Sequence, residues 1–543
     1  MPGQLDRIKQ QAKKQRLAGN LQKAKALYEQ FLKAFPSDPE ASLDLGDVYM
    51  KLEDFESAVR LYAKMLEKRA DNPLVLSNLG GALLRQGKPN DARAMLEYAL
   101  ELDPKNIFAR INLGGVLQAQ GDLKKALENA LEAISIDPTH PLAFNNLGSA
   151  FSDLAMFAEA KHAFETAAML DPKSIDALIN LAGSESKLGN HQASIDRYEQ
   201  VLAMLPPEAV RRAEAVKFFA AFEYLSLGNL EKGWEYYEGG FSPLVPLKGA
   251  RTPNRRFPFP KWAGEELICK KLIVWREQGL GDELLFASCI PDLIKAHPEA
   301  EIVLESEPRL VNIFQSSFPQ ILVRPSIGDT HYKYSEGRFD YHIPIGSLPY
   351  FFRRSIDSFK RRPHYIKLDP IIKEAAQNRL PESPKLKVGI CWRSGMLSPT
   401  RNINYTMLSD WGFLKDFKND IDIVNLQYGD CEYEILDAEA RFEVNILRWK
   451  DLDLKNDLES TLALVSCLDA VISVDSSPSA YAGALGIKTI YLARRGWFFL
   501  GQEGLPWFNS FINVIAEQGS EVTECLDRVP IELSRILEKK NDI

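Results

Sequence analysis

The first 206 residues repeat one pattern of apolar, small and polar positions with a period of 34 residues. In each copy a leucine precedes a small residue, alanine recurs at a second position, and most copies end at a proline. This period predicts a stack of paired helices, in which small residues let neighbouring helices approach closely and each pair buries its apolar face against the next. The small residues after leucine are Gly46, Gly80, Gly114, Gly148 and Ala182.

A degenerate copy of the same pattern follows at about residues 212–240, with Gly228, Gly233 and Tyr237 in the corresponding places. The sequence therefore predicts an all-α domain over residues 1–240, made of six repeats and a degenerate seventh helix pair.

The pattern changes in the second half, where short apolar runs alternate with amphipathic stretches. This alternation predicts parallel sheets covered by helices, hence an α/β fold. A helical stretch at Asp369 to Leu380, followed by Pro381 and Pro384, divides two Rossmann-like lobes, at residues 263–380 and 381–543. The predicted strands are Lys271 to Trp275, Glu301 to Leu304, Ile321 to Val323, Tyr341 to Pro344, Leu386 to Trp392, Ile421 to Gln427, Ala470 to Val474 and Thr489 to Leu492.

Residues 241–262 join the helical and α/β parts and are rich in proline, which disfavours regular structure. We expect a linker. Its basic residues, Lys248, Arg251, Arg255 and Arg256, are expected to form a solvated strap.

One polar position of the repeats also recurs every 34 residues, just before the leucine. A carboxamide both donates and accepts hydrogen bonds, so a column of them could grip an extended peptide of any sequence. The alternative is that the column serves the repeat's own packing and hydrogen bonds. The column consists of Asp44, Asn78, Asn112, Asn146 and Asn180.

Two strand ends carry residues that could take part in catalysis or ligand binding. After the strand that ends at Trp275, Gly279 and Gly281 permit close backbone approach, and Asp282 lies near a helix start, as either a general base or a helix cap. After the strand that ends at Val474, the chain reads Asp475, Ser476, Ser477, Pro478 and Ser479, and a glycine-containing helix follows. Free amides at such a helix start favour phosphate.

Composition excludes several classes of protein. The net charge of -8, with no basic excess in either half, disfavours a nucleic-acid partner. We expect no membrane span, since no stretch of 18 apolar residues occurs. Six scattered cysteines without a CxxC indicate neither a zinc site nor a disulfide framework, and together with the absence of a signal peptide they favour the cytoplasm.

The repeat pattern resembles the tetratricopeptide repeat, and its polar column resembles the superhelix of O-linked N-acetylglucosamine transferase. In that enzyme, asparagines at the same repeat position hold the acceptor polypeptide. The resemblance implies a protein acceptor held by the column.

Residues 256–515 resemble the heptosyltransferase-type GT-B fold of glycosyltransferases. The matching segments include Glu277 to Asp282, Gly389 to Arg393, Asn425 to Gln427 and Val474 to Gly486. The resemblance implies that Asp282 is the base that deprotonates the acceptor. It also implies that Arg401 or Arg393 neutralises the leaving group without a metal or other cofactor, and that Gln427 lies near the base or ribose. The remaining donor-binding residues implied are Gly279, Gly281, Asp475, Ser476, Ser477 and Ser479.

The combined architecture is similar to bacterial flagellin glycosyltransferases, which implies transfer of a sugar from a nucleotide sugar to Ser or Thr of a protein acceptor, with flagellin suspected. Ala480 stands where relatives commonly carry histidine, so the donor could differ. Two alternatives stay open: a lipopolysaccharide-core glycosyltransferase, and a non-catalytic repeat scaffold with a degenerate transferase lobe.

Overall fold

The computed structural model describes residues 2–68, 71–245, 250–327, 337–359, 364–395, 398–517 and 520–541. It divides into two compact units, Met1–Ser184 and Glu185–Ile543, so the last repeat helices belong to the same unit as the α/β part. Pro246 and Lys248 of the expected linker lie outside the described residues. Within the described ranges, no helix is both long and apolar enough to cross a membrane.

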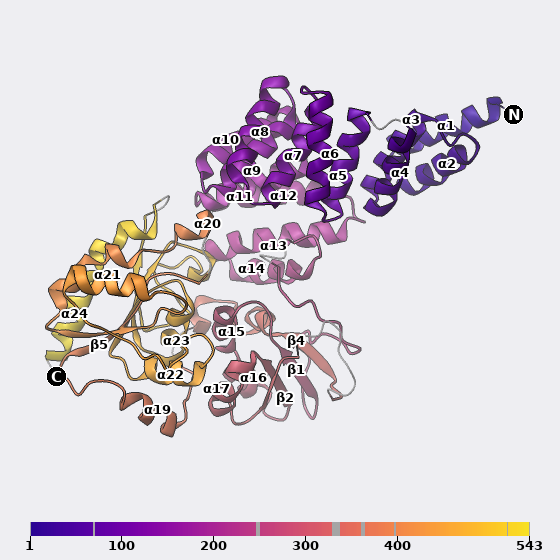
Figure 1. Cartoon of the computed structure of the whole chain (residues 1–543). Helices are drawn as coiled ribbons and strands as arrows, with labels where there is room; N and C mark the ends of the chain where they lie inside the picture. The colour runs from indigo at the N-terminus through magenta and orange to yellow at the C-terminus, as the bar shows by residue number, and fades with distance from the viewer. Residues whose placement is uncertain are drawn as a thin grey trace. The chain divides into compact units, whose positions relative to one another are not determined.

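The repeats form consecutive antiparallel helix pairs, coloured indigo to magenta in Figure 1. Fourteen helices occur in the described part before residue 240, which is the number predicted from six repeats and a degenerate pair. They are α1 (Pro2–Leu17), α2 (Leu21–Ala34), α3 (Pro39–Lys51), α4 (Phe55–Lys68), α5 (Pro73–Arg85), α6 (Pro89–Leu102), α7 (Ile107–Ala119), α8 (Leu123–Ile136), α9 (Pro141–Asp153), α10 (Phe157–Leu170), α11 (Ile175–Lys187), α12 (His191–Met204), α13 (Val210–Ser226) and α14 (Leu230–Tyr237).

The recurring glycine marks a close approach between the two helices of a pair. A Cβ atom added at Gly46 would lie 2.3 Å from the Tyr62 hydroxyl, and one added at Gly148 would lie 2.6 Å from the Phe164 ring. The large side chain of the second helix therefore fills the space that the missing Cβ leaves. This complementarity explains why glycine and a bulky residue keep the same spacing in these repeats.

The first α/β lobe contains a parallel sheet with the strand order β3-β2-β1-β4 in its described residues. Counted from its first strand, this is the 3-2-1-4 order of a doubly wound sheet, so the reversal of order falls between β1 and β4. The strands are β1 (Lys271–Trp275), β2 (Glu301–Ser306), β3 (Leu322–Pro325) and β4 (Tyr341–Pro344), and the helices are α15 (Leu280–Ala287), α16 (Ile290–Ala296), α17 (Val311–Ser317), α18 (Leu348–Phe352) and α19 (Pro370–Gln377).

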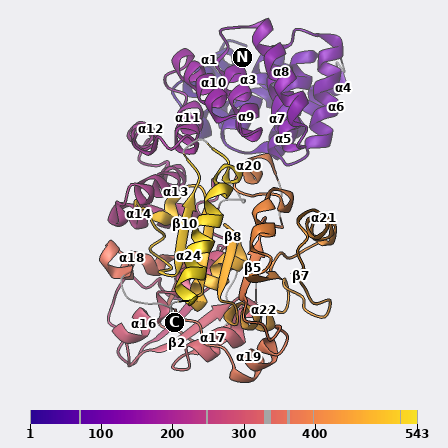
Figure 2. The ribbon, with the colours of Figure 1, turned by 90° about the vertical axis from the view of Figure 1, so that its left-hand side faces the viewer.

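The second lobe has the parallel strand order β10-β9-β8-β5-β6-β7. Read from the β7 edge, with β5 counted as the first strand, this is the doubly wound order 3-2-1-4-5-6. Figure 2 shows β10, β8, β5 and β7 following one another across this sheet. The strands are β5 (Leu386–Cys391), β6 (Ile421–Asn425), β7 (Ile446–Leu447), β8 (Ala470–Val474), β9 (Lys488–Ala493) and β10 (Phe511–Ile515), and the helices are α20 (Pro399–Asn402), α21 (Glu432–Phe442), α22 (Leu458–Ser466), α23 (Ser477–Leu485) and α24 (Val529–Asn541).

The segment before β1 differs from the solvated strap predicted from its prolines. Arg251 and Arg255 are 1% and 5% exposed, whereas Arg256 is exposed as expected. The Arg251 guanidinium donates to Glu277 Oε2 at 2.6 Å, and Arg255 forms an ion pair with Glu305. The prediction was wrong for these two residues because each has a buried carboxylate partner in the first lobe, which sequence spacing does not reveal.

Candidate functional site

Asp282 lies in the first turn of α15, directly after the loop that follows β1. The Gly279 N–H donates to Asp282 Oδ2 at 3.2 Å, so the carboxylate does cap the helix. Its other oxygen is not used by this bond. Asp282 is half-buried and also lines a cavity, so capping and a chemical role are compatible.

The second strand end, after β8, is organised by its own hydroxyl groups. The Ser476 N–H donates to Ser479 Oγ at 3.2 Å, and Ser479 Oγ donates to the Ser476 carbonyl at 2.7 Å. Ser476 Oγ donates in turn to the Val474 carbonyl at 3.1 Å. These bonds fix the loop and leave the first-turn amides of α23 as the groups that a ligand anion would meet.

One cavity of about 320 Å³ brings the two strand ends together. It lies within the second compact unit, and α20, which follows the loop after β5, supplies a third wall. Of the catalytic and donor-binding residues predicted from sequence, seven line it: Gly281, Asp282, Arg401, Asp475, Ser476, Ser477 and Ser479.

The charges of this cavity are poorly balanced. Burial, together with the smaller effect of the nearby carboxylates of Asp475 and Glu277, raises the pKa of Asp282 to about 6, against the Gly279 N–H bond, which lowers it. Burial also raises the pKa of Asp475, whose side chain bonds with Tyr491. Arg401 is half-buried, and its guanidinium group has no hydrogen-bond or ion-pair partner among the described residues. The cavity thus holds a carboxyl group that titrates near neutrality and an uncommitted guanidinium group.

Aromatic side chains form much of the remaining wall, and none of them is among the site residues predicted from sequence. Tyr405 follows α20, Tyr428 follows β6 and Tyr491 lies on β9, and all three contact the cavity together with Trp497 and Phe498. Apolar and aromatic walls with a few convergent polar groups are typical of small-molecule sites. The sequence shows aromatic residues throughout, so only their convergence in the fold distinguishes these five.

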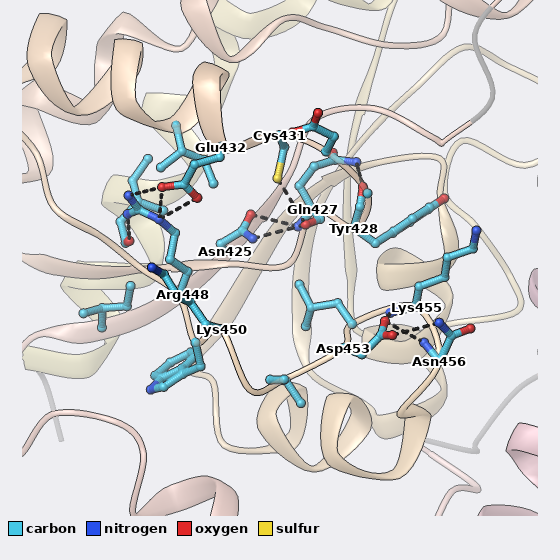
Figure 3. Close-up of a pocket in the computed structure, with 18 of the residues that line it drawn as sticks. Asn425, Gln427, Tyr428, Cys431, Glu432, Arg448, Lys450, Asp453, Lys455 and Asn456 are labelled. Carbon is cyan, nitrogen blue, oxygen red and sulfur yellow. Dashed lines mark hydrogen bonds and ion pairs between the residues drawn. The ribbon is translucent and has the colours of Figure 1, made fainter.

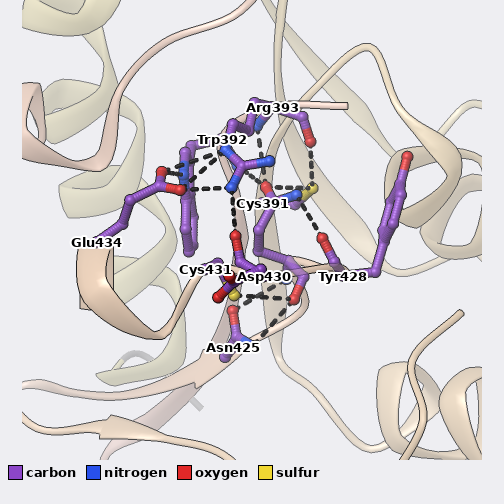
Figure 4. A network of polar contacts seen from close by, with 9 residues as sticks. Cys391, Trp392, Arg393, Asn425, Tyr428, Asp430, Cys431 and Glu434 are labelled. Atoms are coloured by element: carbon purple, nitrogen blue, oxygen red, sulfur yellow. Dashed lines mark hydrogen bonds and ion pairs between the residues drawn. The ribbon is translucent and has the colours of Figure 1, made fainter. Parts of the chain in front are cut away.

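Arg393 does not line this cavity. Its guanidinium forms an ion pair with Glu434 and donates to the Asp430 carbonyl at 2.9 Å (Figure 4). The Glu434 carboxylate also accepts the Trp392 indole N–H at 2.5 Å. Arg393 therefore holds α21 against the loop after β5, and of the two candidate arginines only Arg401 faces the cavity.

Gln427 also organises the loop after β5. Its Oε1 accepts the backbone N–H of Trp392 at 3.2 Å and of Arg393 at 3.0 Å. Gln427 lines a neighbouring cavity of about 850 Å³ at the carboxyl ends of β6 and β7. Tyr428 lines both cavities, so the two adjoin.

Figure 3 shows the larger cavity and its basic wall. Arg448 is held by Glu432 at 2.9 Å and by Glu439 at 2.8 Å. Asp453 is occupied in its own turn, where it accepts the backbone N–H groups of Lys455 and Asn456. Lys450 also lines this space. The sequence predicts Gln427 near the base or ribose of a donor, and it predicts no site residue within 445–456.

The polar column of the repeats is occupied by internal bonds at most of its positions. Asn112 Nδ2 donates to the Ser77 carbonyl at 3.1 Å, and Asn146 Nδ2 donates to the Ile111 carbonyl at 2.7 Å. Each amide thus joins its own repeat to the preceding one. In the first compact unit, Asn180 likewise donates to Asn145 Oδ1 at 3.0 Å, and Asp44 accepts the Tyr28 hydroxyl at 2.6 Å.

Asn78 is the exception in the column, since its half-buried side chain has no hydrogen-bond partner among the described residues. No group of three or more His, Cys, Asp or Glu side chains in the described ranges is placed to hold a metal ion.

Comparison with known proteins identifies the helical half. Two profiles described as tetratricopeptide repeat match residues 16–79, 83–147 and 142–174. The helical array is made of tetratricopeptide repeats. It is followed in the chain by the two parallel sheets described above.

A curated relative covers a larger part of the chain. Protein FlbA of Caulobacter vibrioides is 31% identical over 367 residues, which is 65% of this chain and 60% of FlbA. The match therefore spans less than two thirds of that relative's length.

Similar solved structures include a thermophilic tetratricopeptide-repeat protein of Thermus thermophilus, 19% identical with a TM-score of 0.31, covering 33% of this chain and 98% of that one. Another is PilW, described as a type IV pilus biogenesis factor, 23% identical with a TM-score of 0.32, covering 37% of this chain and 92% of that one.

Proposed function

We propose that this protein is a glycosyltransferase that moves a sugar from a nucleotide-sugar donor to a Ser or Thr hydroxyl of a protein acceptor, with flagellin as the proposed acceptor. The observation that carries the proposal is the cavity at the carboxyl ends of β1 and β8. There Asp282, with a pKa of about 6, and the unpartnered Arg401 line the same space as the start of α23. Ligands of doubly wound sheets bind at this edge.

In the proposed reaction, Asp282 takes the proton of the acceptor hydroxyl while the hydroxyl oxygen bonds to the anomeric carbon of the sugar. The bond between that carbon and the phosphate oxygen of the donor breaks, and the nucleotide leaves with the electron pair. The first-turn amides of α23 and the Arg401 guanidinium offset the charge on the leaving phosphate. No metal is required in this scheme.

The adjoining larger cavity suits the nucleoside part of the donor. It lies beyond Tyr428 at the ends of β6 and β7, in the same lobe as α23. Its Gln427 and Tyr428 offer polar and aromatic surface for a ribose and a base. The tetratricopeptide repeats support a protein acceptor, because such superhelices present extended binding surfaces.

The proposal is tested by incubating the purified full chain with flagellin and a panel of CMP, UDP, GDP and ADP sugars, and measuring the intact mass of the acceptor. A mass increase by one sugar residue with one donor is expected, and the amount formed in the same time should be strongly reduced with an Asp282→Asn variant. If no donor increases the acceptor mass and no nucleotide raises the melting temperature of the chain, the non-catalytic scaffold becomes the better explanation.

A further inference from the structure

A separate cavity of about 480 Å³ lies within the second compact unit, and it plays no part in the proposed transfer. Its walls come from the end of α11, the start of α12, the loop after β9 and the end of the 3-10 helix η9 (Val522–Arg528). The charged and titratable residues that line it are Lys187, His191, Arg494, Arg495, Glu517 and Arg528.

The charge of this cavity opposes that of the whole chain. Four side chains that are cationic at neutral pH face one carboxylate, Glu517, whereas the chain as a whole carries a net charge of -8. Glu223 lies nearby but is already committed, since it accepts from Ser186 Oγ at 2.6 Å and bonds His191 Nδ1 at 2.7 Å. Glu521 also attracts the Arg494 guanidinium. The four cations therefore still outnumber the carboxylates Glu517 and Glu521 that face them.

Two of the cations stand out because their charged groups are uncommitted. Neither the Lys187 ammonium group nor the Arg494 guanidinium group makes a hydrogen bond or ion pair with any residue of the described ranges. Arg495 and Arg528 each donate to one backbone carbonyl, that of Gln502 at 2.9 Å and that of Ile515 respectively, and these neutral carbonyls leave their charges uncompensated.

Partial desolvation makes the missing counter-charge costly. The Lys187 side chain is open to solvent inside the cavity, yet the surrounding walls lower its pKa despite the attraction of Glu223. Desolvation also lowers the pKa of Arg494, which is half-buried, despite the attraction of Glu521. Clustered cations without counter-ions are unfavourable in such surroundings, and a bound anion would relieve the penalty.

We propose that this cavity binds a small phosphate-bearing molecule, whose phosphate oxygens are held by Lys187, Arg494, Arg495 and Arg528. Guanidinium groups match the geometry of phosphate oxygens. A ligand with a single carboxylate would leave most of the four cationic groups without a partner. The volume exceeds that of one phosphate group and falls in the range of about 300–1,000 Å³ for small-molecule sites.

This site shares one loop with the candidate active site but does not depend on the proposed function. Arg494, Arg495 and Phe499 face the basic cavity, whereas Trp497 and Phe498 line the cavity that contains Asp282. The test must therefore distinguish the two anion sites. The Arg401→Gln variant of the full chain does so, because it weakens anion binding in the cavity that contains Asp282.

The test is calorimetric titration of pyrophosphate into the Arg401→Gln chain and into the same chain carrying Lys187→Gln and Arg494→Gln as well. We expect the added substitutions to weaken pyrophosphate binding at least tenfold. The matched control Arg535→Gln, at an exposed position of α24, should leave the affinity unchanged. A variant with Lys187→Arg and Arg494→Lys, which keeps both charges, should retain most of the affinity and excludes misfolding as the cause.

Equal pyrophosphate affinity with and without Lys187 and Arg494, or no pyrophosphate binding to the Arg401→Gln chain, would overturn the proposal. Citrate provides the second arm, because it carries multiple carboxylates and no phosphate. Citrate binding as tight as that of pyrophosphate would refute a phosphate site. In a further readout, pyrophosphate should protect Lys187 from acetylation by acetic anhydride while leaving the exposed Lys124 reactive.

Discussion

The polar column of the repeats and the cavity at the strand ends both consist of residues that the sequence marks as chemically capable, but they differ in how those residues are satisfied. Asn112 and Asn146 donate to carbonyls of the preceding repeat. In the strand-end cavity, the Arg401 guanidinium group has no partner in the described part of the chain, and Asp282 keeps one oxygen outside its capping bond. Polar groups that a fold leaves unsatisfied are better pointers to a ligand than polar groups that merely recur.

The largest effect is expected from Asp282→Asn, which keeps the shape of the side chain but removes the base. Transfer should fall by about 10²–10⁴-fold, the usual contribution of general acid–base catalysis. Nucleotide affinity, measured by calorimetry, should change little, because the donor phosphate is bound by other groups. The exposed Asp437→Asn is the matched control and should transfer normally. Undiminished transfer by Asp282→Asn would remove Asp282 from the reaction.

Arg401 and Arg393 allow a sharper comparison, since they are the same residue type in the same lobe. Arg401→Gln should weaken nucleoside diphosphate binding by about 10–100-fold, as expected for the loss of a charge-assisted hydrogen bond of about 1.5–3 kcal/mol. Arg393→Gln should instead lower the melting temperature, because it leaves Glu434 without its ion pair. Calorimetry and thermal unfolding of both variants check this. The reverse outcome would show that Arg393, not Arg401, faces the donor.

The pH dependence follows from the raised pKa of Asp282. Below pH 6 the carboxyl group is increasingly protonated and cannot act as a base, so the transfer rate should fall about tenfold for each pH unit below 6 and level off above it. A flat rate between pH 5 and pH 8 would contradict the assignment.

Stability should show the same group with the opposite trend. The folded-state pKa of Asp282 exceeds the unfolded value of about 3.9, so ionisation of this carboxyl group destabilises the folded state. The free energy of unfolding therefore decreases as the pH rises from about 4 through 6. Asp282→Asn should therefore gain melting temperature relative to the unchanged protein over this pH window. Thermal unfolding of both proteins at pH 5 and pH 8 measures the difference.

Sequence periodicity predicted most of the fold because it reports burial directly. The bounds of β1, β4 and β8 agree with the predicted runs, and the helix pairs follow the 34-residue period. Two edge strands were missed. β7 has only two residues, and β10 is half-buried along most of its length, so neither produces the continuous buried run of a central strand.

The site was predictable only where its residues follow a strand end. Asp282 and Ser476 do so and meet at one cavity. The selection of Arg401 over Arg393 depends on Glu434, which lies 41 residues from Arg393 in the chain, and no local pattern specifies that partner. The basic cavity could not be predicted for the same reason, because Lys187 comes from a repeat helix and Arg494 from a loop after a sheet strand.

The smallest effect is expected in the column itself. Asn112→Ala removes the donor to the Ser77 carbonyl and should lower the free energy of unfolding by about 1 kcal/mol. Asn78→Ala removes no hydrogen bond within the described residues and should leave stability unchanged within a few tenths of a kcal/mol. Because Asn78 is the free amide of the column, peptide gripping should appear there as a loss of acceptor affinity without a loss of stability. If Asn78→Ala and the double variant Asn112→Ala, Asn146→Ala both bind the acceptor normally, the column serves only the packing of the repeats.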